Sequence, residues 1–174
     1  MKYRRYGAYK ASGVEWLGDV PAHWTMTTVK QCYGAQLGKM LQNAPASEQD
    51  VSVPYLKAVN VLLEKVAFDE LPEMWASPKE IEQYAVKSGD LLVCEGGEPG
   101  RSAILDVSPP LCIIQNALHR VRPKHGNNLK YLLYFLRYAG SSGWLDVLCN
   151  KATIAHFTGD KLGNLEFPLP STQE

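Results

Sequence analysis

Short hydrophobic segments separated by Gly, Pro and Asp run through the first two-thirds of the chain. Such segments are rich in β-branched and aromatic residues, which is typical of strands. The segments that we expect to form strands are 26–33, 53–61, 65–68, 90–94, 102–105, 111–114 and 118–121. Because turn residues interrupt them so often, they predict an irregular, strongly bent β-sheet.

The last third of the chain has the spacing of a helix instead. Leu129, Leu132, Leu133 and Leu136 recur on one face, which predicts a main helix over 128–138. A shorter helix is expected over 142–149, and the two prolines within 165–170 favour extended chain there.

One further short helix is predicted between the expected strands. Ser77 is suited to cap it, Pro78 fits its first position, and Glu80 completes a capping box before the helix ends near Tyr84. Together these elements indicate the α+β (mixed α/β) class, with one bent sheet and a few short helices.

Composition limits the chain to one folded domain, since it has 174 residues, 45% of them hydrophobic and 21% charged. Its 18 basic and 18 acidic residues cancel, which excludes a uniformly basic nucleic-acid binder. The charge is nevertheless uneven: five basic and two acidic residues lie in 1–30, five and eleven in 31–100, and eight and five in 101–174. An acidic middle therefore lies between two basic ends.

Targeting and metal chemistry find little support. The basic start lacks an apolar h-region and no segment has the length of a membrane helix, so we expect a cytoplasmic protein. Cys32, Cys94, Cys112 and Cys149 form no C-x-x-C pair, which argues against a metal site and favours reduced thiols. A small hydrolase that uses Cys94 or His156 remains open as a minor alternative.

Four polar loops carry the residues that suit ligand contact, over 36–43, 89–102, 115–122 and 150–161. Amide and guanidinium side chains are the groups that read base edges and bind phosphates. Each loop has an ordinary interpretation as well: a strand connection, a bulged hairpin, a strand, and a loop whose threonines cap the backbone. The local pattern does not choose between these interpretations.

Longer motifs carry a resemblance to a known family. Residues 9–24, Tyr-Lys-Ala-Ser-Gly-Val-Glu-Trp-Leu-Gly-Asp-Val-Pro-Ala-His-Trp, closely resemble the opening signature of specificity (S) subunits of type I restriction–modification systems. The segments Gly89-Asp-Leu-Leu with Gly97-Glu-Pro-Gly-Arg, 115–123 and 153–162 are similar to later motifs of that family, in the same order. One departure is Ala155, where the family often has proline.

The resemblance implies a single DNA target-recognition domain over 26–170, with 1–25 packed on it as a signature segment and 171–174 beginning a spacer helix that is missing here. The implied function is sequence-specific binding of double-stranded DNA without catalysis or a cofactor. Methyltransferase (M) subunits, and through them the restriction (R) subunit, would be partners, and a half subunit could form a dimer. A protein-interaction scaffold that tethers a methyltransferase, with little DNA affinity of its own, is the alternative.

The predicted DNA-binding residues come from all four loops. They are Lys39, Gln42, Gly97, Arg101, Gln115, Asn116, His119, Arg120, Lys151, Thr153, His156 and Thr158.

Overall fold

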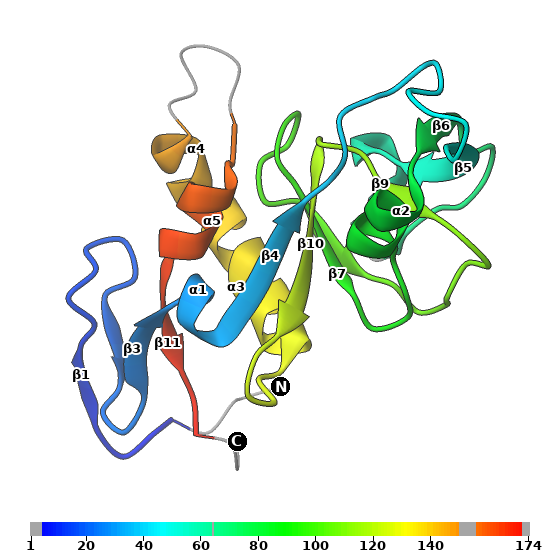
Figure 1. Ribbon diagram of the computed structural model, residues 1–174. Coiled ribbons are helices and arrows are strands. Elements are labelled where there is room, and N and C mark those ends of the chain that lie inside the picture. Colours follow the sequence, from blue (N-terminus) through cyan, green and yellow to red (C-terminus); the bar gives the residue numbers. More distant parts are fainter. Residues whose placement is uncertain (1–4, 64, 150–155, 172–174) are drawn as a thin grey trace.

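The computed structural model describes residues 5–63, 65–149 and 156–171. Its centre is an antiparallel sheet in the order β4-β10-β7-β8, which is crossed on one face by the long helix α3 (Figure 1). The bounds of these elements are β4 Tyr33–Leu37, β7 Leu91–Cys94, β8 Ser102–Ile104, β10 Leu118–Pro123 and α3 Leu129–Ser141. The mixed α+β class that the sequence predicts is confirmed.

A second, smaller sheet lies beside the central one, on the right of Figure 1. It has the order β6-β5-β9, with β5 antiparallel to β6 and parallel to β9. Its strands are β5 Val51–Leu56, β6 Glu73–Ala76 and β9 Ile113–Ile114, and they pack with η1 Ala58–Asn60 and α2 Pro78–Tyr84.

Two small pairings and three short helices complete the fold. The pairings are β1 Tyr9–Ala11 with β2 Asp19–Pro21, and β3 Thr25–Thr28 with β11 Glu166–Leu169. The helices are α1 Val29–Cys32, α4 Trp144–Leu148 and α5 Gly159–Asn164. Among the described residues, no helix is long and apolar enough to cross a membrane.

Strand β7 is buried along its whole length because both faces of the central sheet are covered. Leu91 and Val93 pack into the core formed with α3, whereas Leu92 and Cys94 pack into a second core shared with the β5 region. Side chains alternate between the faces of a strand, so one hydrophobic run supplies both cores.

The opening segment packs its tryptophans against the helices. Trp16 stacks on Trp144 of α4 with ring centroids 5.6 Å apart, and it also contacts Phe135 of α3. Trp24 meets Tyr131 of α3 edge-on at 6.1 Å. Large aromatic side chains contribute much of their stabilisation by such burial.

The predicted helices and the buried strands 90–94, 102–105 and 118–121 are confirmed within a few residues. In α2, Ser77 Oγ accepts from Glu80 N, and a Glu80 carboxylate oxygen accepts from Ser77 N, which is the expected capping box.

Several predicted elements are wrong in part, each for a local reason. The expected strand 26–33 ends at Thr28, where Gln31 Oε1 accepts from Thr28 N and helix α1 begins. The expected strand 53–61 ends at Leu56, since Asn60 Oδ1 accepts from Lys57 N and closes η1.

Two other segments also differ from the prediction. Residues 65–68 contribute only the bridge between Val61 and Val66, and 111–114 pair only over β9. Strands β1, β2 and β6, helix α5 and all of β4 beyond Tyr33 were not predicted, because these stretches are too short to show a clear hydrophobic period.

Candidate functional site

Four loops meet at one edge of the central sheet, where β4 ends and β10 begins, at the upper end of both strands in Figure 1. We call residues 37–42, 95–101, 115–117 and 156–158 the loop edge. Backbone hydrogen bonds join the loops in series: Asn116 N donates to Lys39 O at 2.9 Å, Glu95 N to Ala117 O at 3.0 Å, and Phe157 N to Glu95 O at 2.6 Å. Residues far apart in sequence thus form one continuous surface.

The first loop is held by a buried lysine. Lys39 is only 6% exposed, and its Nζ donates to Glu80 Oε1 at 2.5 Å and to Gln42 Oε1 at 2.8 Å. The hydrogen bond from Lys39 lowers the pKa of the Glu80 carboxyl. Gln42 Nε2 in turn donates to Asp50 Oδ2 at 3.0 Å. Lys39 therefore braces the loop from inside, and the side chain that the loop presents outward is Met40, which is 74% exposed.

The second loop is the glycine turn, which is held close to helix α4. Gly97 and Gly100 both have a φ of +78°, a conformation that favours glycine. A Cβ at Gly100 would lie 2.2 Å from Leu145 Cδ1, whereas one at Gly97 would meet nothing within 4 Å. Gly100 therefore permits close packing, and Gly97 forms the exposed part of the turn.

Arg101 lies at the end of the turn, and two nitrogens of its guanidinium donate hydrogen bonds within the protein. Its Nη1 donates to Glu98 Oε2 at 3.2 Å, and its Nη2 donates to Ala58 O at 3.0 Å. The guanidinium thus links the glycine turn to the smaller sheet.

Two basic residues of β10, His119 and Arg120, are buried. His119 is 1% exposed, and its Nε2 lies 3.0 Å from Phe157 O, to which it donates. Burial lowers the pKa of His119, which keeps the imidazole neutral near pH 7. Arg120 is 8% exposed and donates from Nη1 to Ala85 O. Both side chains therefore serve internal contacts.

Arg122, two residues along β10, pairs with Asp90. Its Nε and Nη2 donate to the two carboxylate oxygens at 2.6 and 2.8 Å. This bidentate pairing raises the pKa of Arg122. The strand that looks most basic in the sequence thus offers little free positive charge.

Gln115 and Asn116, the amide residues before β10, are less buried than His119 and Arg120. A turn at Asn116 and Ala117 separates β9 from β10, so residues 115–120 do not form one continuous strand. Gln115 and Asn116 are half-buried at the loop edge, and Gln115 pairs with Lys39 as an isolated bridge. Their position on the turn makes them the amide side chains nearest to solvent between β9 and β10.

The fourth loop is described only from His156 onward, and the predicted contacts Lys151 and Thr153 lie outside the described residues. His156 has a side chain 55% exposed at the loop edge. Thr158 caps helix α5, with its Oγ1 accepting from Lys161 N at 3.4 Å. The lysine Nζ donates to His156 O at 3.0 Å, which places a cation beside the edge.

Glu95 is the residue of this site that sequence reasoning missed. Its carboxylate lies between two histidines, with Oε2 3.6 Å from His119 Nε2 and Oε1 3.9 Å from His156 Nδ1. Its backbone joins the third and fourth loops, as described above. A lone glutamate in a glycine-rich turn gave no signal, because its partners lie far away in the sequence.

The thiol alternative loses support from the structure. All four cysteines are buried and free, and burial raises the pKa of the Cys94 thiol, which disfavours the nucleophilic thiolate. Within the described ranges, no three His, Cys, Asp or Glu side chains gather in a way that could hold a metal ion.

Fold and site together define a mixed α+β domain that presents several polar loops at one edge of its central sheet. Residues 39–174 match the family model of the type I restriction modification DNA specificity domain. Because this match covers most of the chain, the protein belongs to that family. No curated protein matches the chain.

Solved structures show the same fold. One is from a study of complex assembly and conformational transition of the type I R-M system; it has a TM-score of 0.61 and 19% identity, and the match covers 90% of this chain and 36% of that one. The HsdS subunit from Thermoanaerobacter tengcongensis is similar with a TM-score of 0.58, 18% identity and coverage of 93% and 36%. The S subunit from M. genitalium is similar with a TM-score of 0.57 and 16% identity, and the match covers 87% of this chain and 35% of that one. The chain thus spans about a third of the length of these structures.

Proposed function

We propose that this protein binds double-stranded DNA sequence-specifically, as the target-recognition module of a type I restriction–modification complex. The observation that carries the proposal is the loop edge, where amide residues, the glycine-turn backbone and an exposed imidazole converge in a member of a DNA specificity family. Amide side chains at such an edge are suited to hydrogen bonding with base edges in the major groove.

The predicted residues divide between two roles in this proposal. Gln115, Asn116, His156, Gly97 and the remaining donors of Arg101 form the outer surface that meets DNA, with Thr158 positioning the fourth loop. Lys39, Gln42, His119 and Arg120 hold that surface in place from beneath, since their hydrogen-bond partners lie inside the protein. Lys151 and Thr153 stay predictions.

Partner subunits would perform the chemistry. We propose that methyltransferase subunits carry out methylation, that a restriction subunit joins through them, and that this chain acts in the cytoplasm without a bond-making role of its own. The buried thiols and neutral His119 are consistent with binding rather than catalysis. If the chain is a half subunit, two copies would read the two halves of a bipartite site.

Selection of duplexes from a random pool tests the proposal directly. The chain is used together with its methyltransferase partner, and the enriched duplexes are then measured against scrambled ones over a series of salt concentrations. We expect one short sequence to be enriched and its affinity to fall as salt rises, because phosphate contacts release counterions.

The scaffold alternative predicts a different result. The chain would co-purify with the methyltransferase, yet replacing its loop-edge residues would leave the selected sequence unchanged. Enrichment of no sequence at all would contradict the DNA-recognition proposal.

A further inference from the structure

Large apolar side chains are exposed on the first loop of the loop edge, beside the polar residues proposed to meet DNA. Leu37 is 41% exposed, Met40 74% and Leu41 46%, and all three lie within five consecutive positions. Single apolar residues are normal on a protein surface, whereas a group of them on one loop indicates contact with a partner. These side chains have no part in the hydrogen bonds that hold the loop edge together.

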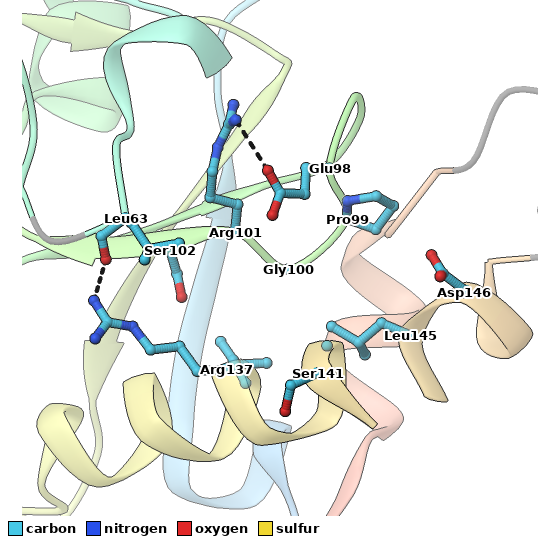
Figure 2. Close-up of a pocket in the computed structure, with 12 residues that line it drawn as sticks. Leu63, Glu98, Pro99, Gly100, Arg101, Ser102, Arg137, Ser141, Leu145 and Asp146 are labelled. Atoms are coloured by element: carbon cyan, nitrogen blue, oxygen red, sulfur yellow. Dashed lines mark hydrogen bonds and ion pairs between the residues drawn. The ribbon is translucent and has the colours of Figure 1, made fainter. Parts of the chain in front are cut away.

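A cavity of about 460 Å³ lies beneath the glycine turn, between it and helices α3 and α4 (Figure 2). None of the three apolar residues of the first loop lines it. Two cations in its walls already donate to groups of the protein, Arg101 to Glu98 and Arg137 to Leu63 O. The cavity and the apolar loop are therefore separate features, and the loop is the one that continues the surface of the amide residues.

The backbone on both sides of Met40 is held by hydrogen bonds. Just before it, Lys39 N donates to Ile114 O at 2.8 Å. Just after it, Gln42 O accepts from Trp75 N at 3.0 Å. Because this part of the loop is ordered before a partner arrives, less entropy is lost when Met40 makes a contact.

Met40 lies next to Asn116 across a backbone bridge. Lys39 and Gln115 pair as a parallel bridge, in which Asn116 N donates to Lys39 O at 2.9 Å. Met40 and Asn116 are the residues that follow this bridge on its two chains. An exposed thioether and a half-buried amide thus occupy neighbouring positions of the loop edge, from which both can reach the same part of a bound duplex.

The major groove of DNA offers a chemical match to this pair of side chains. The apolar group on its base edges is the C5 methyl of thymine. A methionine side chain is flexible and polarizable, so it packs on such a group without needing one exact shape. The adenine that pairs with thymine presents N6 and N7, which an asparagine amide binds in a bidentate manner. Met40 and Asn116 together therefore fit A·T pairs better than G·C pairs.

We propose that Met40 is a specificity-determining residue, which packs on the methyl group of a thymine in the recognised DNA sequence, beside the base that Asn116 contacts. Leu37 and Leu41 flank this contact and shield it from water. The inference rests on the proposed DNA-binding function and deepens it, because it names a base of the site and the apolar side chain that reads it.

Replacement of thymine by uracil tests the contact, because the two bases differ only in the C5 methyl group. The chain with its methyltransferase partner first selects its sequence from the random pool, and each thymine of that sequence is then replaced singly by uracil. At one thymine we expect the affinity to fall about fourfold, as for the loss of one buried methyl group. This ratio should stay constant as salt rises, although the overall affinity falls, because an apolar contact releases no counterions.

Met40→Ala links the effect to this residue. The variant should bind the thymine duplex at least fourfold more weakly than the wild type, and it should no longer distinguish thymine from uracil at that position. Its Tm should stay unchanged, because Met40 is largely exposed. Val107→Ala, which shortens an exposed apolar side chain outside the loop edge, should keep the wild-type affinity and the wild-type discrimination.

The possible results separate this inference from the function on which it rests. A selected sequence without a thymine that is sensitive to uracil, or a Met40→Ala variant that keeps the full discrimination, would overturn the role of Met40 and leave sequence-specific binding intact. Loss of co-purification of Met40→Ala with the methyltransferase would show that the loop contacts protein instead, and would overturn it as well. Enrichment of no sequence would contradict the proposed function and, with it, this inference.

Discussion

The loop edge and the interior of strand β10 contain the same kinds of side chain, yet they use them differently. At the loop edge, Asn116 is half-buried and the His156 side chain is largely exposed, so both side chains reach solvent. A few residues along the chain, His119 and Arg120 are almost fully buried and donate to backbone carbonyls. Residue type alone therefore does not show which polar groups are exposed, because burial and internal hydrogen bonds differ between these positions.

Lys39 illustrates the same contrast within one loop. It is one of the predicted DNA-binding residues, and in the structure its ammonium is enclosed by Glu80 and Gln42. The neighbouring Met40 takes the outward position. A buried charge is retained only with such partners, because desolvation is costly.

The first loop lies directly against the backbone of residues 114 and 115 at Gly38, and disturbing this contact should have the largest effect on stability. A Cβ at Gly38 would lie 2.3 Å from Gln115 O and 2.4 Å from Ile114 O, and backbone atoms cannot move away easily. We expect Gly38→Ala to reduce the free energy of unfolding by about 3 kcal/mol or more in urea denaturation. Gly7→Ala, whose Cβ meets nothing within 4 Å, is the control. Similar stabilities of the two variants would contradict the packing described here.

Removing the internal lysine should have the next largest effect. Lys39→Met leaves Glu80 and Gln42 without their donor, and we expect a loss of about 2 kcal/mol of unfolding free energy. Lys79→Met removes an exposed charge from α2 and should change stability by less than about 0.5 kcal/mol. A Lys39→Met variant as stable as the wild type, but with weaker DNA binding, would return Lys39 to the DNA-contacting surface.

Replacing an amide of the loop edge should weaken DNA binding but change stability little. We expect Asn116→Ala to weaken binding of the selected duplex by about 1–3 kcal/mol and to relax the preference at one base pair, with little change in Tm. Arg120→Met should lower Tm but leave the base preference intact, because Arg120 bonds within the protein. Competition binding against single-base variants of the site measures both. A base preference altered only by Arg120→Met would reverse our division of roles.

The smallest effect on stability is expected from the protonation of His119 as the pH falls. Burial lowers the pKa of His119 below the ordinary value of about 6.5, so the unfolded chain binds this proton more readily than the folded protein does. The free energy of unfolding is therefore unaffected by this group above a pH of about 6.5. As the pH falls below that value, the free energy of unfolding decreases by less than about 1.4 kcal/mol per pH unit. We expect His119→Gln to reduce the pH dependence of unfolding between pH 7 and 5, whereas His125→Asn, at an exposed position, should not. An identical pH dependence in both variants would exclude His119 as its source.

Local patterns were reliable wherever one hydrophobic period or one cap determined the structure. The leucine spacing predicts α3, and Ser77, Pro78 and Glu80 predict α2, because these signals involve residues close together in sequence. Predictions failed where a side chain ended a strand early, as Gln31 does at Thr28 and Asn60 at Lys57. Hydrophobicity does not register such hydrogen bonds.

The candidate site, too, could be predicted only where its signals come from residues close together in sequence. The sequence indicated the four loops and the family resemblance, and the family model matches residues 39–174. It could not show that Glu95 lies between His119 and His156, because 24 residues separate Glu95 from His119 and many more separate it from His156. The cavity beneath the glycine turn gave no sequence signal, since its walls come from four separate segments.

The sequence by itself thus determined the fold class, the main helix, the capped helix, the buried strands and the family resemblance. All of these depend on local periodicity or on contiguous motifs. Only the tertiary structure decided which polar residues face outward, because burial and pairing depend on what the rest of the chain places around each side chain. For that reason Lys39 became an internal brace and Asn116 a half-buried amide at the surface, although both are polar residues in loops of the same edge.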